Sequence, residues 1–298
     1  MSFDGPRSAS LIDETRAFYA RRTPGRGPSD AVELRSMRAA APAPTPSDPP
    51  ARTELADSGG HAVPVRVQLP RAGSPAGVLL DIHGGGFYLG SAADHDLRNQ
   101  DLADALGIAV VGVDYRLAPE DPWPAAPEDC ATAARWLVDH AARRFGTTRL
   151  AIGGFSAGAT LAMTTLVRLR DRGVDAFGSA VLQFGTYDLS GRTPSGRLIA
   201  DEYFIEAYAG RAPDRTHPDV SPIYADLSRL PPVQLIVGAE DVLLGDNRAM
   251  AARLAAAGVD VDLRVYPAAP HGFTAHPTPM ADAARADLRQ WLAERLAR

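Results

Sequence analysis

A serine set between glycines is the first feature of this sequence that could carry chemistry. It stands in the motif Gly154-Phe155-Ser156-Ala157-Gly158. The motif follows a short apolar run at 150–152, typical of a buried strand, and precedes a helical pattern at 158–171. In that context, small flanking residues permit the strained turn, called a nucleophile elbow, that projects a serine hydroxyl into a crevice. A plain glycine-rich turn is the alternative, but the flanking elements favour Ser156 as a nucleophile.

A serine nucleophile needs a general base and a carboxylate that orients the base. His271 lies in a loop after the last predicted strand, and Asp241 follows the apolar run at 233–237. Because ligands meet a parallel sheet at the carboxyl ends of its strands, both side chains can reach the predicted nucleophile. We predict His271 as the base and Asp241 as the acid. Glu240 and Asp246 are the competing acids.

A second glycine-rich motif follows the apolar run at 77–82 and reads His83-Gly84-Gly85-Gly86-Phe87. Glycines let a backbone approach a ligand closely and aim N–H groups at the negative charge that develops in acyl transfer. A phosphate-binding loop is the alternative, but that motif needs a following lysine, and this sequence contains no lysine. We interpret His83 as a residue that braces the loop, because a catalytic base must face the nucleophile.

The composition excludes several other chemistries. All 31 basic residues are arginines, which excludes a P-loop, a lysine Schiff base and an S-x-x-K acylase. The formal net charge is -5 without a block of like charges, so no nucleic-acid partner is expected. The single cysteine, Cys130, falls in an apolar helical pattern and is expected in the core. No metal site and no cofactor are expected, because the remaining histidines show no ligand spacing. These are His61, His95, His140, His217 and His276.

The sequence also predicts where the protein works. No apolar segment approaches the ~18 residues that a membrane span needs. The first ten residues contain Asp4 and lack the apolar stretch of a signal peptide. We therefore expect a cytoplasmic protein without a stable membrane anchor. Its expected partner is a small-molecule substrate, and a homodimer is compatible with the sequence.

The order of predicted strands and helices indicates an α/β fold. Apolar runs without alternation, which are typical of strands buried on both faces, lie at 77–82, 108–113, 150–152, 180–182 and 233–237. Helical patterns lie at 95–106, 125–145, 158–171, 245–257 and 279–297. Alternating runs at 63–69 and 261–265 complete the sheet, and the first is expected to be the edge strand at which the sheet begins. The pattern predicts a mostly parallel central sheet flanked by helices.

Two regions interrupt this alternation. Residues 1 to about 60 hold one predicted helix around 11–20, followed by a segment rich in proline, alanine, serine and arginine. Residues 190–218 contain clusters of glycine, proline and arginine around one short aromatic helix at 201–208. We interpret the second region as an insertion that lies over the edge of the sheet.

With these motifs in place, the sequence resembles the hormone-sensitive-lipase branch of the α/β-hydrolases, the bacterial HGGG esterases related to arylacetamide deacetylases. The resemblance spans about residues 60–275 and includes further motifs in consistent order. These are Asp114-Tyr115-Arg116-Leu117-Ala118-Pro119-Glu120, Trp123-Pro124-Ala125-Ala126, Ser221-Pro222, Gly238-Ala239-Glu240-Asp241 and His271-Gly272-Phe273. The resemblance implies an α/β-hydrolase catalytic domain over 51–298. It also implies a mobile cap made of the N-terminal segment 1–50 and the insertion at about 190–218.

The resemblance further implies an oxyanion hole made of backbone N–H groups. The residues implied are Gly85, Gly86 and Ala157, with Gly84 as the next candidate. Two positions depart from the family pattern: Phe155 stands where many relatives have an acidic residue, and Val242 stands where a proline commonly follows the acid. Neither departure removes a catalytic group, but Phe155 is expected to make the surroundings of the nucleophile more apolar than in those relatives.

These observations together predict a serine carboxylesterase that hydrolyses short-chain, largely apolar esters through a Ser-His-Asp triad and an acyl-enzyme. An N-deacetylase or amidase would use the same triad. A small-molecule receptor without turnover is the alternative from another class, but a complete triad would have no use there.

The walls of the substrate pocket are expected to be aromatic and aliphatic. The residues that adjoin catalytic groups in sequence are Phe87, Tyr88, Phe155 and Leu243. The insertion adds Tyr203, Phe204 and Tyr208 as candidates for the wall beneath the cap. As an alternative, these three aromatic side chains pack the cap on the core.

Overall fold

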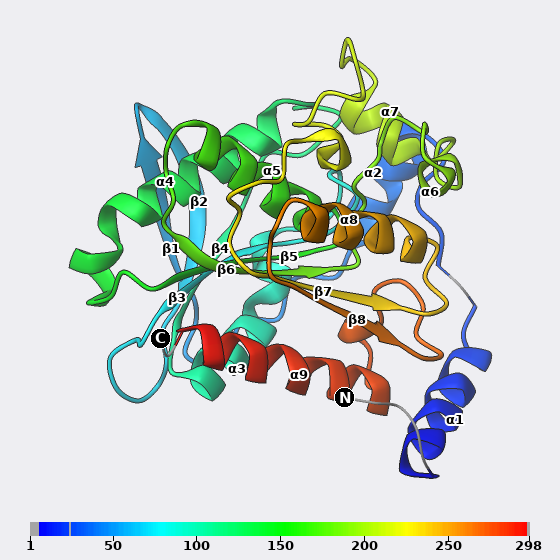
Figure 1. Cartoon of the computed structure of the whole chain (residues 1–298), viewed down its shortest axis with the longest axis horizontal. Helices are drawn as coiled ribbons and strands as arrows, with labels where there is room; N and C mark the ends of the chain where they lie inside the picture. Colours follow the sequence, from blue (N-terminus) through cyan, green and yellow to red (C-terminus); the bar gives the residue numbers. More distant parts are fainter. Residues whose placement is uncertain (1–5, 24, 297–298) are drawn as a thin grey trace.

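The computed structural model describes residues 6–23 and 25–296, and its centre is an eight-stranded sheet (Figure 1). In chain order the strands are β1 (Arg52–Ser58), β2 (His61–Gln68), β3 (Val78–Ile82), β4 (Ala109–Val113), β5 (Leu150–Phe155), β6 (Phe177–Gln183), β7 (Val233–Gly238) and β8 (Val261–Tyr266). Across the sheet their order is β1-β2-β4-β3-β5-β6-β7-β8. Strand β2 is antiparallel to β1 and β4, and the pairs from β4 to β8 are parallel.

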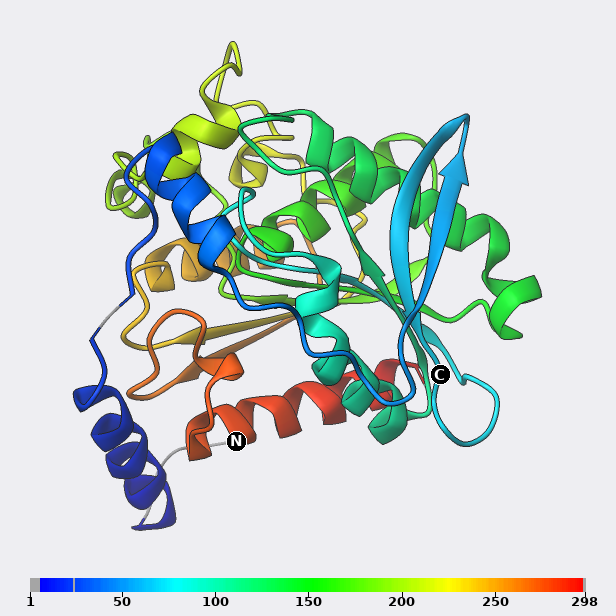
Figure 2. The ribbon, with the colours of Figure 1, turned by 180° about the vertical axis from the view of Figure 1, so that it is seen from behind.

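Helices cover both faces of this sheet (Figure 1 and Figure 2). One face carries α3 (Asp96–Leu106) and α9 (Pro279–Leu296). The other carries α4 (Ala125–Phe145), α5 (Ala157–Asp171) and α8 (Leu244–Ala256). The predicted α/β class with a mostly parallel sheet is therefore confirmed. Residue 297, which ended the last predicted helix, lies outside the described residues.

The residues of β3 explain why the central strands show no alternation. Every residue of this strand is buried. Neighbouring side chains of a strand point to opposite faces, so Leu79 and Leu80 enter different hydrophobic cores. Leu80 packs in the core beneath α4 and α5, whereas Leu79 packs with Leu102 of α3 and Trp291 of α9. A strand covered on both faces must be apolar on both faces.

The sheet does not begin where the sequence predicts. Residues of β1 form a hairpin with β2 through Gly59 and Gly60, so β2 is the second strand and β1 is the edge. The expected edge strand at 63–69 is thus wrong in position. The residues of β1 are mostly exposed, and Leu55 points outward with 64% of its surface accessible. Pairing with β2 makes this segment a strand, and its own hydrophobic pattern gives little signal.

The N-terminal region also holds a helix that the sequence pattern did not predict. Helix α2 (Ala31–Ala40) begins after Asp30, whose side chain accepts hydrogen bonds from the backbone N–H groups of Val32 and Glu33. An aspartate followed three residues later by a glutamate is a known signal for a helix start. The run of prolines that follows the helix obscures this signal.

The two segments expected to form a cap lie together only in part. Helix α2 lies near α6 (Pro194–Arg197) and α7 (Tyr203–Ala209) of the insertion at the upper right of Figure 1. Helix α1 (Pro6–Ala20) lies apart from them and packs against the start of α9. There the Tyr19 hydroxyl lies 2.9 Å from Nδ1 of His276. Residues 1–5 and 24 of the expected cap segment lie outside the described residues.

In the described part of the chain, none of the helices combines the length and the apolar character that a membrane span requires.

Candidate active site

Ser156 occupies a strained turn between a strand and a helix. Strand β5 ends at Phe155, helix α5 begins at Ala157, and Ser156 between them has φ 55° and ψ -119°. Such a conformation costs a non-glycine residue ~1–3 kcal/mol and persists only where the surrounding structure enforces it. It turns the serine side chain out of the strand direction at the carboxyl edge of the sheet.

The two glycines of the motif are required by close backbone contacts. A Cβ atom on Gly154 would lie 2.1 Å from the carbonyl oxygen of Gly158. A Cβ atom on Gly158 would lie 2.0 Å from the carbonyl oxygen of Ile82, at the end of β3. Both distances are far below van der Waals contact with backbone atoms that cannot swing away. The turn therefore closes tightly and holds the start of α5 against the end of β3.

Three side chains from distant parts of the chain form a hydrogen-bonded array. The Ser156 hydroxyl oxygen lies 2.9 Å from Nε2 of His271. Nδ1 of His271 lies 3.0 Å and 3.2 Å from the two carboxylate oxygens of Asp241. The Asp241 side chain is 0% exposed, whereas 38% of the His271 side chain is accessible. The carboxylate is thus shielded from water, while the imidazole faces the space above the serine.

The competing acids lie elsewhere. Asp246 accepts hydrogen bonds from the backbone N–H groups of Tyr187 and Asp188. Burial raises the pKa of this carboxyl to about 6. Glu240 is exposed to solvent. Within the described residues, neither acid forms a hydrogen bond with His271.

The loop after β3 lies directly against the elbow. A Cβ atom on Gly84 would lie 2.6 Å from the carbonyl oxygen of Phe155 and 3.3 Å from Cβ of Ser156. Gly85 and Gly86 have φ values of 113° and 59°, which favour glycine. A Cβ atom on Gly85 would also lie 2.0 Å from the carbonyl oxygen of Leu89. The glycines therefore let this loop turn sharply beside the serine.

The N–H groups expected to hold an oxyanion are open. In the described part of the chain, no backbone carbonyl accepts from the N–H of Gly85, Gly86 or Ala157. Ala157 is the first residue of α5, where backbone N–H groups have no partner within the helix and the helix dipole favours negative charge.

His83 is buried behind the glycine loop. Its ring stacks on Tyr115 at a centroid distance of 4.1 Å, and Nδ1 lies 2.7 Å from the carbonyl oxygen of Gly84. The Tyr115 hydroxyl donates to the backbone oxygen of His83 at 3.0 Å. Burial lowers the pKa of His83 to about 4, so the ring is neutral at physiological pH. These contacts fit a residue that braces the loop.

A cavity of about 380 Å³ opens above Ser156 and His271, and most of its surface is apolar. Five of the residues expected in the pocket wall line it, namely Phe87, Tyr88, Phe155, Phe204 and Leu243. Tyr203 and Tyr208 do not. Tyr208 is buried and stacks on Phe87 at 4.0 Å, and Tyr203 lies beside Tyr88 at a centroid distance of 6.1 Å. Tyr203 and Tyr208 thus pack the insertion on the core. This packing was the alternative to the expectation that they line the pocket.

Several residues of the cavity wall carry no motif in the sequence. They are Gly27, Leu89, Thr186, Ile199, Glu202 and Val242. Among the described residues that line this cavity, Glu202 is the only acidic one. The Thr186 hydroxyl is buried and has no hydrogen-bond partner among the described residues. Val242 could have been predicted as a wall residue from the sequence, because it follows Asp241 directly. Gly27 could not, because only the folded chain places it where a Cβ atom would lie 2.7 Å from the Tyr88 hydroxyl oxygen.

Over residues 6–23 and 25–296, no group of three or more histidine, cysteine, aspartate or glutamate side chains could hold a metal ion.

Comparison with known proteins gives the family. Residues 79–275 match the family described as the alpha/beta hydrolase fold, and this stretch contains Ser156, Asp241 and His271. The chain belongs to the α/β-hydrolase family. The expected fold is therefore confirmed by sequence as well as by the sheet order.

Two curated relatives extend this result. This α/β-hydrolase is 35% identical over 229 residues to an ethyl acetate hydrolase of Pseudomonas putida. The alignment covers 72% of each chain. It is 37% identical over 198 residues to an acetyl-hydrolase of Streptomyces hygroscopicus. That alignment covers 63% of this chain and 65% of the relative.

A solved structure from the hormone-sensitive-lipase branch of the family is similar to this chain. A crystal structure of an esterase from the bacterial hormone-sensitive lipase family aligns with a TM-score of 0.75 and 32% identity. The alignment covers 99% of this α/β-hydrolase and 100% of that chain. The resemblance to the hormone-sensitive-lipase branch is therefore confirmed.

Proposed function

We propose that this protein hydrolyses short-chain, largely apolar carboxylic esters with Ser156 as nucleophile, His271 as base and Asp241 as orienting acid. The observation that carries the proposal is the hydrogen-bonded array of these three side chains at a strained strand-to-helix turn. The relatives named as ethyl acetate hydrolase and acetyl-hydrolase support the reaction class. The chain is a carboxylic ester hydrolase.

In the proposed acylation step, the Ser156 oxygen attacks the ester carbonyl while His271 Nε2 takes the hydroxyl proton. Asp241 keeps the other ring nitrogen protonated and stabilises the positive charge that forms on the imidazole. When the tetrahedral intermediate collapses, the bond to the alcohol oxygen breaks and His271 gives that oxygen its proton. The alcohol leaves, and the acyl group remains on Ser156.

In the proposed deacylation step, a water molecule attacks the acyl-enzyme while His271 takes one of its protons. The bond to the Ser156 oxygen then breaks, that oxygen regains its proton, and the carboxylic acid is released. The accessible edge of His271 suits this step, because water must reach the imidazole. The proposed cycle uses no metal and no organic cofactor, and its only partner is the small-molecule ester.

We further propose that backbone N–H groups of Gly85, Gly86 and Ala157 hold the oxyanion, with Gly84 as the next candidate. Their open hydrogen-bonding capacity supports this role. One such donor lowers the barrier by about 3 kcal/mol when it is positioned for the transition state. A backbone donor is held by the fold and needs no reorganisation during the reaction.

The cavity supports the preference for short chains. Its volume is about 380 Å³, and residues of the N-terminal segment and of the insertion, Gly27 and Phe204 among them, form part of its wall. We propose that the part of the N-terminal segment that follows α1 acts as the cap together with the insertion. Each methylene that fits an apolar pocket gains ~0.8 kcal/mol, so activity should rise over the first few carbons. It should then fall when the acyl chain meets the cap.

The Ser156→Ala variant tests the proposed nucleophile. It should lose hydrolysis of p-nitrophenyl acetate and covalent labelling by a fluorophosphonate probe, because only the nucleophilic oxygen is removed. Circular dichroism should show an unchanged fold. Substantial turnover by this variant would overturn the assignment of the nucleophile.

A chain-length series tests the proposed substrate class. The value of kcat/KM should be measured for p-nitrophenyl esters from acetate to palmitate, and the maximum should lie among the short chains. A maximum at the longest chains would refute the closed pocket while leaving the proposed triad intact. Activity on the matching anilides but not on the esters would favour an amidase instead.

A further inference from the structure

A second cavity lies on the other side of the nucleophile strand. It is small, about 50 Å³, and it sits between β3, β5 and β6 of the sheet and the helices α3 and α9. Gly153 and Gly154 form part of its wall, so its inner end lies directly behind the elbow. It shares no residue with the wall of the cavity above Ser156.

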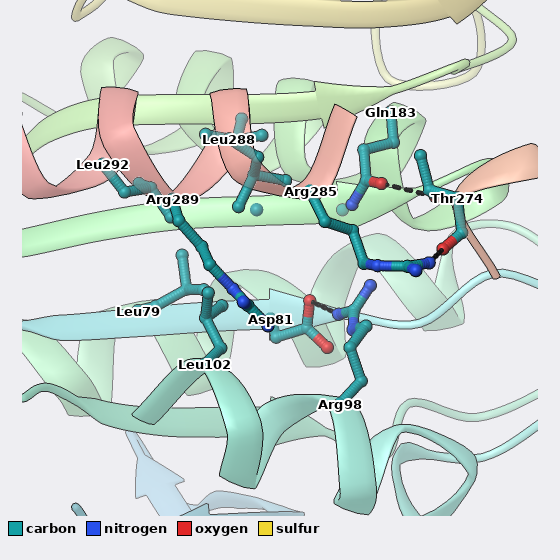
Figure 3. Close-up of a pocket in the computed structure, with 13 residues that line it drawn as sticks. Leu79, Asp81, Arg98, Leu102, Gln183, Thr274, Arg285, Leu288, Arg289 and Leu292 are labelled. Carbon is teal, nitrogen blue, oxygen red and sulfur yellow. Dashed lines mark hydrogen bonds and ion pairs between the residues drawn. The ribbon is translucent and has the colours of Figure 1, made fainter. Parts of the chain in front are cut away.

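Three arginines and one aspartate face this space (Figure 3). Arg98 reaches toward it from α3, and Arg285 and Arg289 come from α9. Asp81 lies between them on β3. By simple charge count, the groups that line this cavity carry an excess of positive charge.

The charge of Asp81 is already balanced by other partners. Arg98 donates to one of its oxygens, and His95 Nδ1 and the Asn99 amide lie 2.9 Å and 3.1 Å from the other. Burial alone would raise the pKa of this carboxyl, but the guanidinium of Arg98 and the nearby His95 outweigh burial and hold the pKa well below its usual range, so Asp81 is ionised. Both carboxylate oxygens of Asp81 therefore already accept hydrogen bonds from Arg98, His95 and Asn99.

Among the described residues, neither arginine of α9 forms an ion pair with an acid that lines the cavity. Arg285 donates to the backbone oxygen of Thr274 and pairs with Asp282, whose side chain is 74% exposed and lies outside the cavity wall. Within residues 6–23 and 25–296, Arg289 forms no ion pair and no side-chain hydrogen bond. Gln183 adds a donor, because its Oε1 accepts from the Thr274 hydroxyl and its amide NH₂ has no acceptor among the described residues.

The remaining walls are aliphatic. They consist of Leu79, Leu102, Val181, Leu288 and Leu292. One water molecule needs ~10–15 Å³ of cavity volume. A cavity of about 50 Å³ therefore accommodates roughly four non-hydrogen atoms. A ligand that fits must be small, must accept hydrogen bonds from guanidinium and amide groups, and must carry an apolar end. A carboxylate matches the planar fork of an arginine, and a methyl group matches the leucines.

We propose that the cavity between α3 and α9 binds a carboxylate anion of the size of acetate. Its carboxylate group contacts Arg289 and the Gln183 amide, and its methyl group packs among the leucines. Acetate belongs to the class of acids that short-chain ester hydrolysis releases. The proposed binding does not depend on that reaction, and it is measured without turnover.

Calorimetric titration with sodium acetate at constant ionic strength tests this site. The wild-type protein should bind acetate saturably, and Arg289→Gln should lower the affinity at least tenfold, because it removes the guanidinium that has no ion-pair partner among the described residues. Arg248→Gln is the matched control, since Arg248 is exposed on α8 and does not line the cavity. Its titration should match that of the wild type.

Further measurements distinguish this cavity from the one above Ser156 and from nonspecific binding of anions. Acetate bound above Ser156 would be unaffected by Arg289→Gln, so equal titrations of wild type and variant would overturn the proposal. Sodium chloride with the same effect as acetate would overturn the carboxylate assignment. Gly153→Ala keeps all three arginines but adds a methyl group 3.4 Å from Leu79, and it should weaken acetate binding by occupying the space. Unchanged affinity in this variant would place the anion outside the cavity.

Discussion

The cavity above Ser156 has a floor and a roof that are built in different ways. The floor consists of the loops that follow β3, β5, β7 and β8, and it carries Ser156, Asp241 and His271. Its shape depends on backbone packed against backbone: a Cβ atom on Gly158 would lie 2.0 Å from the carbonyl oxygen of Ile82. Such contacts leave no freedom for the main chain.

The roof is the proposed cap, residues 25–40 and 190–218, and side chains connect it to the rest of the molecule. Arg38 of α2 donates to the backbone oxygens of Tyr88 and Ala118 and pairs with Glu120 at 2.9 Å. The insertion is held by the stacking of Tyr208 on Phe87. Because side chains can be removed singly, the roof can be loosened without disturbing the floor. Changes in the floor should therefore affect kcat, and changes in the roof should affect KM and chain-length preference.

The largest effect is expected for the two acids that follow β7. Asp241→Asn should lower kcat by about 10⁴, because an amide beside Nδ1 favours the wrong tautomer of His271. Asp246→Asn should cost far less, because Asp246 contacts the backbone of Tyr187 and not the imidazole. Steady-state kinetics with p-nitrophenyl acetate measures both. If the two variants ranked in the opposite order, Asp246 would be the orienting acid.

Gly158→Ala should destabilise the floor itself. A Cβ atom there meets backbone atoms of Ile82 and His83, which must move to make room. We expect a loss of at least ~3 kcal/mol in the free energy of unfolding, at the upper end of overpacking effects. Urea denaturation measures this loss. Ala159→Gly, one residue further along α5, is the comparison that removes a methyl group instead of adding one. A Gly158→Ala protein as stable as the wild type would show that the turn can relax.

The pH dependence of stability should report the buried carboxyl of Asp246. Its pKa is raised to about 6 in the folded state, against about 4 in an unfolded chain. The folded protein therefore keeps this proton after the unfolded chain has lost it. The contribution of Asp246 to stability should be fully present below about pH 4 and should fall by ~3 kcal/mol as the pH rises to about 6.

Asp246→Asn isolates this contribution, because an amide does not ionise. The free energy of unfolding of the wild type minus that of the variant should decrease between pH 4 and pH 7, as measured by urea denaturation at each pH. Parallel profiles for the two proteins would contradict the raised pKa.

The smallest effect is expected in the roof. Arg38→Ala removes the hydrogen bonds that hold α2 to Tyr88 and Ala118, which should raise KM several-fold with kcat within about twofold. The preferred acyl chain should also become longer. Arg35→Ala is the matched control, because Arg35 is an exposed arginine of the same helix. Equal kinetic constants for the two variants would show that Arg38 does not position the roof.

The sequence alone predicted the floor because its signals are local. The strained turn requires glycines next to Ser156 in the chain, and the strands buried on both faces require unbroken apolar runs. Both requirements are met within a few consecutive residues. For the same reason Asp241 and His271 could be proposed from their places after predicted strands, although their contact with each other depends on the folded chain.

The sequence predicted the insertion at 190–218, but only the tertiary structure decided which of its residues reach the cavity, where the sheet ends and where the second cavity lies. Strand β1 exists because β2 offers it hydrogen bonds, and its own residues are mostly exposed. Gly27 and Ile199 reach the cavity wall from segments with no motif, and Arg98 and Arg289 face one space from helices far apart in the chain. These features rest on contacts between residues distant in sequence. A pattern read along the chain records which residues are neighbours in sequence, and such contacts leave no trace in it.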